Sequence, residues 1–162
     1  MPIRDARLDD LPRIVRIYNS AIPGRQATAD TAAITVEARL PWFHAHNPET
    51  RPILVLEDDG QVVAWLSLST FYGRPAYHKT VEISVYVDPA HQGKRAGSRL
   101  IEEAIGRAPA LGITTILAFI FNHNIPSLTL FTRHGFERWG LLPQVAELDG
   151  READLAILGR KI

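Results

Sequence analysis

The segment from Lys79 to Ala108 constrains the fold of this chain more than any other feature. Lys79 to Val87 carries a valine or isoleucine at every second position, which is the period of a β-strand. A turn rich in glycine and basic residues follows at 91–97. Apolar residues then recur at helical spacing up to Ala108, which predicts a helix with one buried stripe. A strand, a tight turn and a helix in this order indicate a mixed α/β (α+β) fold.

The rest of the chain continues this alternation of strand and helix patterns. We expect Asp9 to cap the first helix, Asn124 to cap the last one, and Gly135 to end it. No repeat, low-complexity tract or charge block interrupts the chain, so residues 1–162 are predicted to form one domain. The expected strands are 3–6, 53–57, 61–71, 79–87, 113–121, 136–147 and 151–159, and the expected helices are 11–22, 35–46, 98–108 and 124–134.

Charge and composition narrow the classes of function. The chain has 18 basic and 18 acidic residues and no formal net charge, which gives no support for nucleic-acid or bulk membrane binding. It has no cysteine, so a disulfide scaffold, a thiolate zinc site and a cysteine nucleophile are excluded. The six histidines show no metal-ligand spacing, and we predict no metal site. With no apolar leader or membrane-spanning run, a cytoplasmic location is expected.

The turn at the start of the helix after Val87 has the composition of an anion site. A helix N-terminus offers free backbone N–H groups and the positive end of a dipole, which together bind phosphate. Gly93 and Gly97 allow a ligand close to the backbone, while Lys94 and Arg95 add positive charge. A pyrophosphate would suit this turn. The alternative is a tight connection with solvated basic side chains, and the absence of Walker and GxGxxG motifs disfavours nucleoside triphosphates and NAD.

Several segments together identify a family resemblance that covers nearly the whole chain. Gln92 to Gly97 resembles the Q/R-x-x-G-x-G/A acyl-CoA loop of the GNAT acetyltransferases. Other segments resemble the phosphinothricin and methionine sulfoximine acetyltransferase branch of that family. They are Tyr18-Asn19, Thr28 to Thr31, Trp42-Phe43, Phe71 to Tyr77, Thr80 to Glu82, Ser84 to Val87, and Asn122 to Phe136.

The resemblance implies a fold, a cofactor and an assembly. The fold would be a strongly twisted mixed sheet of about seven strands flanked by about four helices. The cofactor would be acetyl-CoA, with its pantetheine arm along a splayed central strand, and the protein would be a homodimer acting on a small-molecule amine. The implied cofactor-binding residues are Val85, Tyr86, Val87, Gln92, Gly93, Lys94, Arg95, Ala96, Gly97, Ser98, Asn124 and Ser127.

Glu82 is the candidate catalytic base. It alternates with the valine face of its strand, so it is expected to project from the opposite face. An amine must lose a proton to act as a nucleophile, and a partly buried glutamate is a suitable acceptor because burial raises its pKa. The alternative is a half-exposed surface carboxylate. The resemblance also places Arg74, Tyr77 and Thr31 at the acceptor site, and an arginine there would hold a carboxylate or phosphinate.

Four positions depart from the family pattern. Arg95 replaces the first glycine of the loop; with a negative φ its N–H can still face a phosphate, so we expect anion binding to survive. Ile83 stands where a histidine often follows the glutamate. Ala29 replaces a phenylalanine that packs on the acceptor in many members, which leaves the acceptor open. Phe131 replaces the tyrosine that serves as general acid in many members, so another group or solvent must protonate the thiolate.

Three functions are therefore weighed. The first is acetyl transfer to the amine of a small amino-acid-like acceptor of the phosphinothricin, methionine sulfoximine or methionine sulfone type. The second is acetylation of protein or peptide N-termini on the same fold, and the third is acyl-CoA binding without catalysis. Balanced charge and compact length favour the first over the second, and the presence of both Glu82 and Arg74 favours catalysis over the third.

Overall fold

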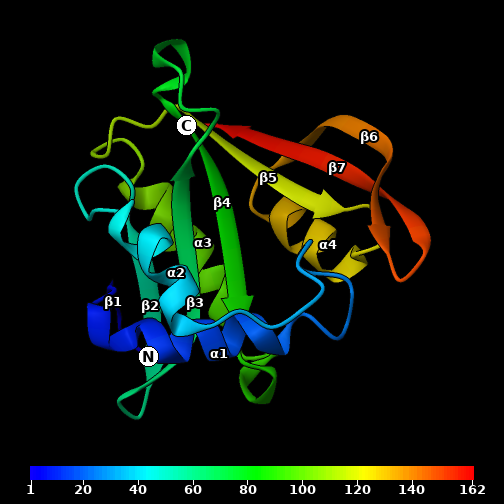
Figure 1. Ribbon diagram of the computed structural model, residues 1–162. Helices are drawn as coiled ribbons and strands as arrows, with labels where there is room; N and C mark the ends of the chain where they lie inside the picture. The colour runs from blue at the N-terminus through cyan, green and yellow to red at the C-terminus, as the bar shows by residue number, and fades with distance from the viewer.

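The computed structural model describes all 162 residues as one seven-stranded mixed sheet flanked by four α-helices, which confirms the expected fold class (Figure 1). The strands lie in the order β1-β2-β3-β4-β5-β7-β6, and only the β4–β5 pair is parallel. The strands are β1 (Ile3–Asp5), β2 (Ile53–Asp58), β3 (Gln61–Thr70), β4 (Thr80–Val87), β5 (Thr115–Phe121), β6 (Glu137–Leu148) and β7 (Arg151–Lys161). The helices are α1 (Leu11–Ser20), α2 (Val36–His44), α3 (Ala96–Arg107) and α4 (Ile125–Arg133).

Helices cover both faces of the sheet and divide the core into two clusters. Helices α1 and α2 lie on one face, around Trp65, whose side chain is 1% exposed. Helix α3 packs on the other face, where Val81 and Ile83 of β4 join its apolar stripe. The alternation along β4 therefore works as the sequence predicts, and Glu82 lies on the face that α1 and α2 cover.

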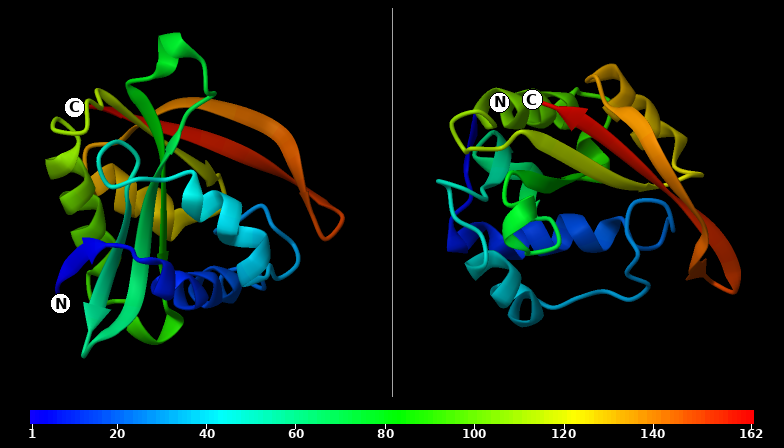
Figure 2. Two further views of the ribbon diagram at one scale, coloured as in Figure 1. Left: turned by 60° about the vertical axis from the view of Figure 1, so that its left-hand side comes forward. Right: turned by 90° about the horizontal axis from the view of Figure 1, so that it is seen from above.

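The first four strands and the last three diverge from one another. The β4–β5 ladder pairs only Thr80–Glu82 with Thr115–Leu117, after which the two strands separate. The C-terminal half of β4 keeps β3 as its only neighbour in the sheet, and β5 continues beside β7. Figure 2 shows the β6–β7 hairpin projecting away from the first four strands. The separation opens a wedge in the middle of the sheet.

The expected cap at the start of α1 is wrong. A 3-10 turn over Leu8–Asp10 precedes the helix, and Asp10 rather than Asp9 occupies the capping position. The Asp10 carboxylate accepts the backbone N–H of Arg7 at 2.7 Å and two hydrogen bonds from the Arg4 guanidinium at 2.7 and 2.9 Å. Capping propensities consider only the residues at the start of the helix, whereas the Arg4 side chain that pairs with Asp10 comes from β1.

Smaller differences concern boundaries. Strand β5 begins at Thr115 rather than Ile113, and α3 begins at Ala96, close to the predicted start. Pro41 lies inside α2, and Thr35 caps that helix by accepting the N–H of Ala38 at 3.1 Å. No helix of the structure is both long and apolar enough to cross a lipid bilayer.

Candidate active site

A pocket of about 510 Å³ fills the wedge between β4 and β5, a volume typical of small-molecule sites. Because the wedge leaves the inner edge of β4 without a neighbouring strand, an extended ligand with amide groups can pair with that edge. The pocket lining is mostly apolar. It consists of Gln26, Ala27, Thr28, Ala29, Glu82, Ile83, Ser84, Val85, Tyr86, Ala118, Phe119, Ile120, Phe121, Asn124, Ser127, Phe131, Val145, Ala146 and Leu155.

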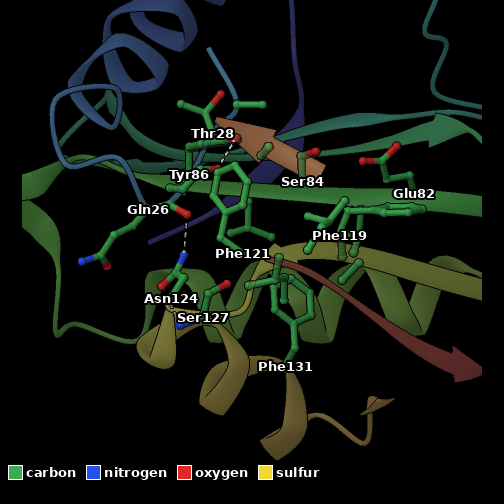
Figure 3. Close-up of a pocket in the computed structure, with 18 of the residues that line it drawn as sticks. Gln26, Thr28, Glu82, Ser84, Tyr86, Phe119, Phe121, Asn124, Ser127 and Phe131 are labelled. Carbon is green, nitrogen blue, oxygen red and sulfur yellow. Dashed lines mark hydrogen bonds between the residues drawn. The ribbon is translucent and has the colours of Figure 1, made fainter. Parts of the chain in front are cut away.

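Glu82 lies at one end of this pocket, with Gln26 and Asn124 at the other (Figure 3). It is the only carboxylate in the lining. Burial raises the pKa of Glu82, and no ion pair counteracts that shift. A carboxylate with a raised pKa is a better proton acceptor than an ordinary surface glutamate. The place of Glu82 in the pocket lining favours the base over the half-exposed surface carboxylate, and its catalytic role stays a prediction.

The segment 26–29 crosses the wide end of the wedge and is held there by side chains from both sides. The Tyr86 hydroxyl of β4 donates to the Ala27 carbonyl at 2.9 Å. The Asn124 side-chain amide donates to the Gln26 carbonyl at 3.2 Å, as the dashed line in Figure 3 marks. The loop after α1 thus forms one wall of the pocket.

Asn124 also caps α4, as predicted. Its Oδ1 accepts the backbone N–H of Ser127 at 3.3 Å, and both residues line the pocket. The Asn124 amide nitrogen carries a second N–H that no protein group accepts. This donor is available to a ligand in the wedge.

The turn before α3 presents a run of free donors. No protein group accepts a hydrogen bond from any backbone N–H between Gly93 and Ser98. Gln92, Lys94 and Arg95 are exposed around these groups. Unpartnered N–H groups at a helix N-terminus, together with nearby cations, form an anion site. The geometry fits the phosphate-binding interpretation of the sequence.

The assumption about Arg95 is wrong. Its φ is +61°, so the arginine itself takes the left-handed conformation that a glycine would adopt at no steric cost. Gly93 has φ +79° for the same turn. At Gly97 a Cβ would lie 3.4 to 3.8 Å from Leu130, Val85 and Val87, which is ordinary van der Waals contact, so packing alone does not require a glycine there. The free N–H groups persist despite the strained arginine.

Comparison with known proteins settles the family. The sequence profile of the Acetyltransferase (GNAT) family matches residues 11–136. The chain is 54% identical to a Bacillus subtilis (strain 168) protein named, provisionally, as a phosphinothricin acetyltransferase, over 100% of this chain and 99% of the relative. It is 37% identical to an L-methionine sulfoximine/L-methionine sulfone acetyltransferase of Pseudomonas paraeruginosa, over 96% and 91%. The chain belongs to the GNAT family of N-acetyltransferases.

Solved structures agree with this membership. A Sinorhizobium meliloti GNAT phosphinothricin acetyltransferase in complex with AcCoA superposes with a TM-score of 0.93 at 31% identity, covering 99% of this chain and 88% of that chain. A Brucella melitensis ribosomal-protein-alanine N-acetyltransferase superposes with a TM-score of 0.95 at 32% identity, covering 100% of both chains. These two structures are named for different acceptors, so the fold alone does not select one.

The GNAT residues expected at the acceptor site lie outside the pocket lining. Arg74 and Tyr77 are exposed on the loop between β3 and β4, and Thr31 is exposed beyond the segment that crosses the wedge. The loop still contacts the pocket lining through aromatic rings. Tyr77 contacts Phe71 edge-on at 5.7 Å between ring centroids, and Phe71 stacks on Phe119 of the lining at 6.4 Å.

Phe131 of this GNAT chain is buried in the pocket wall. Its side chain is 4% exposed and meets Phe136 edge-on, with ring centroids 5.0 Å apart. A phenyl ring has no proton to donate to a leaving thiolate. The structure also shows no group of three or more histidine and acidic side chains placed to hold a metal ion.

Sequence reasoning missed much of the pocket wall. Gln26 and Ala27 stand in a loop with no motif. Ser84 belongs to a segment that resembles the family and shares a strand face with Glu82, but sequence reasoning gave it no role in the site. No local pattern marks the residues that the twisted hairpin and β5 bring to the wedge. These are Ala118, Phe119, Ile120, Phe121, Val145, Ala146 and Leu155.

Proposed function

We propose that this protein transfers the acetyl group of acetyl-CoA to the amine of a small amino-acid-like acceptor of the phosphinothricin, methionine sulfoximine or methionine sulfone type. The acetyl donor would enter the wedge with its pantetheine arm along Val85, Tyr86 and Val87. Its pyrophosphate would lie on the free N–H groups of Gly93 to Ser98. A cytoplasmic location is part of this proposal, because acetyl-CoA is an intracellular metabolite.

The observation that carries the proposal is the position of Glu82 in the wedge. One end of a mostly apolar pocket holds a single carboxylate whose pKa is raised by burial. The other end leads toward the Asn124 amide and the N-terminus of α3, where an extended cofactor finds hydrogen-bond donors. A thioester at the Glu82 end would therefore meet an acceptor amine beside its base.

The reaction proceeds by direct transfer in this proposal. Glu82 takes the proton of the acceptor's ammonium group, directly or through water, and the neutral amine attacks the thioester carbonyl carbon. The nitrogen of the tetrahedral intermediate loses its second proton to solvent, the carbon–sulfur bond breaks, and an amide and the CoA thiolate result. Because Phe131 cannot donate a proton, we assign protonation of the thiolate to solvent. With no cysteine in the chain, no acyl-enzyme on a thiol can form.

The acceptor side includes Arg74, Tyr77 and Thr31 in this proposal. In the single chain they are exposed, and so are Trp139, Leu141, Leu142 and Val145 on the edge strand β6. A homodimer would cover such surfaces and desolvate the arginine, which strengthens its pairing with an acid group. Light scattering on the purified protein tests the dimer, and a mass of one chain, 18.1 kDa, would refute it.

Thiol release from acetyl-CoA tests the reaction. The acceptor panel includes methionine sulfoximine, methionine sulfone, phosphinothricin, polyamines and short peptides. We expect the sulfoximine, the sulfone or phosphinothricin to give the highest kcat/KM. Preference for a peptide with an N-terminal alanine would favour protein acetylation instead, a function that the Brucella melitensis structure is named for. Binding of acetyl-CoA without turnover of any amine would favour a non-catalytic acyl-CoA module.

A further inference from the structure

A half-buried histidine lies on the Glu82 side of the sheet and has no part in the function proposed above. His46 follows α2, and its ring is fixed by two hydrogen bonds. Nδ1 lies 2.7 Å from the carbonyl oxygen of Trp42, and Nε2 lies 3.1 Å from the hydroxyl oxygen of Ser69 on β3. The histidine is thus held between the helix and the strand that borders β4.

The two partners of His46 decide where its proton lies. A carbonyl oxygen only accepts hydrogen bonds, so Nδ1 must carry the N–H that is donated to Trp42. In the neutral ring Nε2 is then an acceptor, and the Ser69 hydroxyl donates to it. Burial is the main cause that lowers the pKa of His46. The hydrogen bond to Trp42 opposes this shift and the Arg39 and Arg51 cations add to it, and the net direction of the pKa shift favours a neutral ring.

Ser69 also stands directly opposite Glu82. The two are Cα partners in the antiparallel β3–β4 ladder, so their side chains share one face with Cβ atoms about 4.5–5.5 Å apart. The Glu82 side chain has no ion pair, and the causes of its pKa shift include no hydrogen bond. The Ser69 hydroxyl donates its hydrogen bond to His46, and its oxygen lone pairs can still accept a hydrogen bond from a protonated Glu82.

We propose that Ser69 and His46 relay the proton of Glu82 away from the acceptor, a role that rests on Glu82 being the base. The proton taken from the ammonium group resides on the Glu82 carboxyl. That carboxyl donates it to the Ser69 oxygen while the Ser69 hydroxyl proton passes to His46 Nε2. Glu82 returns to a carboxylate, His46 becomes an imidazolium, and the imidazolium loses its proton to solvent. Ser69 and His46 are positioning residues that act through Glu82.

Charges around His46 suit a transient proton carrier. The raised pKa of Glu82 and the lowered pKa of His46 approach each other, which favours transfer between them. Arg39 and Arg51 disfavour a lasting imidazolium, so the proton is passed on. Asp5, across the shallow groove that His46 also lines, is the nearby acid on the solvent side. The other titratable residues on the neighbouring elements are Glu37 and His44 of α2, Glu49 of the following loop and Arg4 of β1.

Three substitutions on the same strand test the relay with methionine sulfone as acceptor and acetyl-CoA saturating. Ser69→Ala should lower kcat about tenfold, a coupling typical of groups in one hydrogen-bond network, while KM for acetyl-CoA stays unchanged. Ser69→Thr keeps the hydroxyl and should restore kcat. The matched control is Ser67→Ala, because Ser67 lies on the same face one pair further along, opposite Ser84, and should leave kcat near that of the parent protein.

A double-mutant cycle distinguishes loss of the relay from a structural effect of the substitutions. It also distinguishes failure of the relay from failure of Glu82 as the base. In the Glu82→Gln background, Ser69→Ala and His46→Gln should cause no further loss of kcat, because the proton they relay is absent. Full kcat in Ser69→Ala together with a defective Glu82→Gln would overturn the relay and leave the base intact. Equal losses in Ser67→Ala and Ser69→Ala would also overturn it. Full kcat in Glu82→Gln would remove the base and the relay together.

Discussion

At the scale of single residues, Glu82 gains its character from its surroundings. The side chain lies at the end of an apolar pocket, and burial raises its carboxyl pKa. The same residue on a solvated strand would be an ordinary acid. The face on which Glu82 lies follows from strand alternation, which the sequence shows. The pocket around it follows from the divergence of β4 and β5, which the sequence does not show.

Replacing Glu82 with glutamine should lower kcat by about 10²–10⁴-fold, the usual cost of removing a general base. The affinity for acetyl-CoA, measured by calorimetry, should change little. Part of the lost rate should return at high pH, where more of the acceptor amine is already neutral. Unchanged kcat at neutral pH, with chemistry shown to limit turnover, would refute the assignment.

The pH profile of the parent protein should reflect the same carboxyl. The base acts only when ionised, so kcat/KM should fall as pH falls through the Glu82 pKa. Because burial raises that pKa, the acid limb should lie at a higher pH than for a solvated glutamate. Glu82→Gln should lack this limb. A limb retained in the variant would assign it to another group.

Arg74 is expected to act on the acceptor rather than on the chemistry. Arg74→Ala should raise KM for an acidic acceptor, and the defect should persist at high pH because the acceptor's acid group stays ionised. If the arginine is as exposed in solution as in the single chain, the loss should be below about 1 kcal/mol. If a dimer covers it, the loss should reach about 2–5 kcal/mol in kcat/KM. An unchanged KM would place the acid group elsewhere.

At the scale of elements, the turn between β4 and α3 combines strain with unpartnered donors. Gly93 has φ +79°, and a Cβ there would meet no atom within 4 Å, so the cost of a side chain is purely conformational. Gly106, inside α3, is equally open but helical. A side chain would meet no steric obstacle at either glycine, so the backbone conformation decides the cost of adding one.

Gly93→Ala should destabilise the protein by about 1–2 kcal/mol, the cost of the left-handed conformation for an L-residue. It should also weaken acetyl-CoA binding, because the turn would shift the free N–H groups. Gly106→Ala is the matched control and should stabilise the fold by about 0.5–1 kcal/mol through helix propensity. Urea denaturation measures both. Equal effects at the two positions would contradict the role assigned to the turn.

At the scale of the whole molecule, the two parts of the sheet pair as strands only along the short β4–β5 ladder, although side chains of both parts pack in the larger core cluster. The segment 26–29, Tyr86 and Asn124 connect them across the opening with single hydrogen bonds. A ligand that fills the wedge would add contacts to both parts. Its binding should therefore stabilise the folded state as a whole.

Acetyl-CoA at about one hundred times its Kd should add about 2.7 kcal/mol to the free energy of unfolding. For a chain of this length, each kcal/mol raises Tm by about 2–4 °C, so a shift of about 5–11 °C is expected in calorimetry. CoA should act similarly. Dephospho-CoA is a useful comparison because it keeps the pyrophosphate. No shift with acetyl-CoA or CoA at millimolar concentration would refute the proposed cofactor site.

The sequence by itself determined the order of the elements, the strand-turn-helix unit and the face of β4 that carries Glu82. These depend on periodicity and on turn residues, which are local in the chain. Family membership also followed from motifs in order along the chain. The positive φ of Arg95 could not be predicted from these local patterns. Backbone propensity favours a negative φ for arginine, and only the folded turn imposes a positive φ.

Only the tertiary structure decided which residues meet around the wedge. The Glu82 carboxyl and the 26–29 segment lie in the lining, whereas the Ser69 hydroxyl and the His46 ring lie outside it, on the elements next to β4. Their convergence depends on sheet register, twist and the point at which β4 and β5 separate. These properties arise from packing between segments far apart in the chain, and no local pattern encodes them.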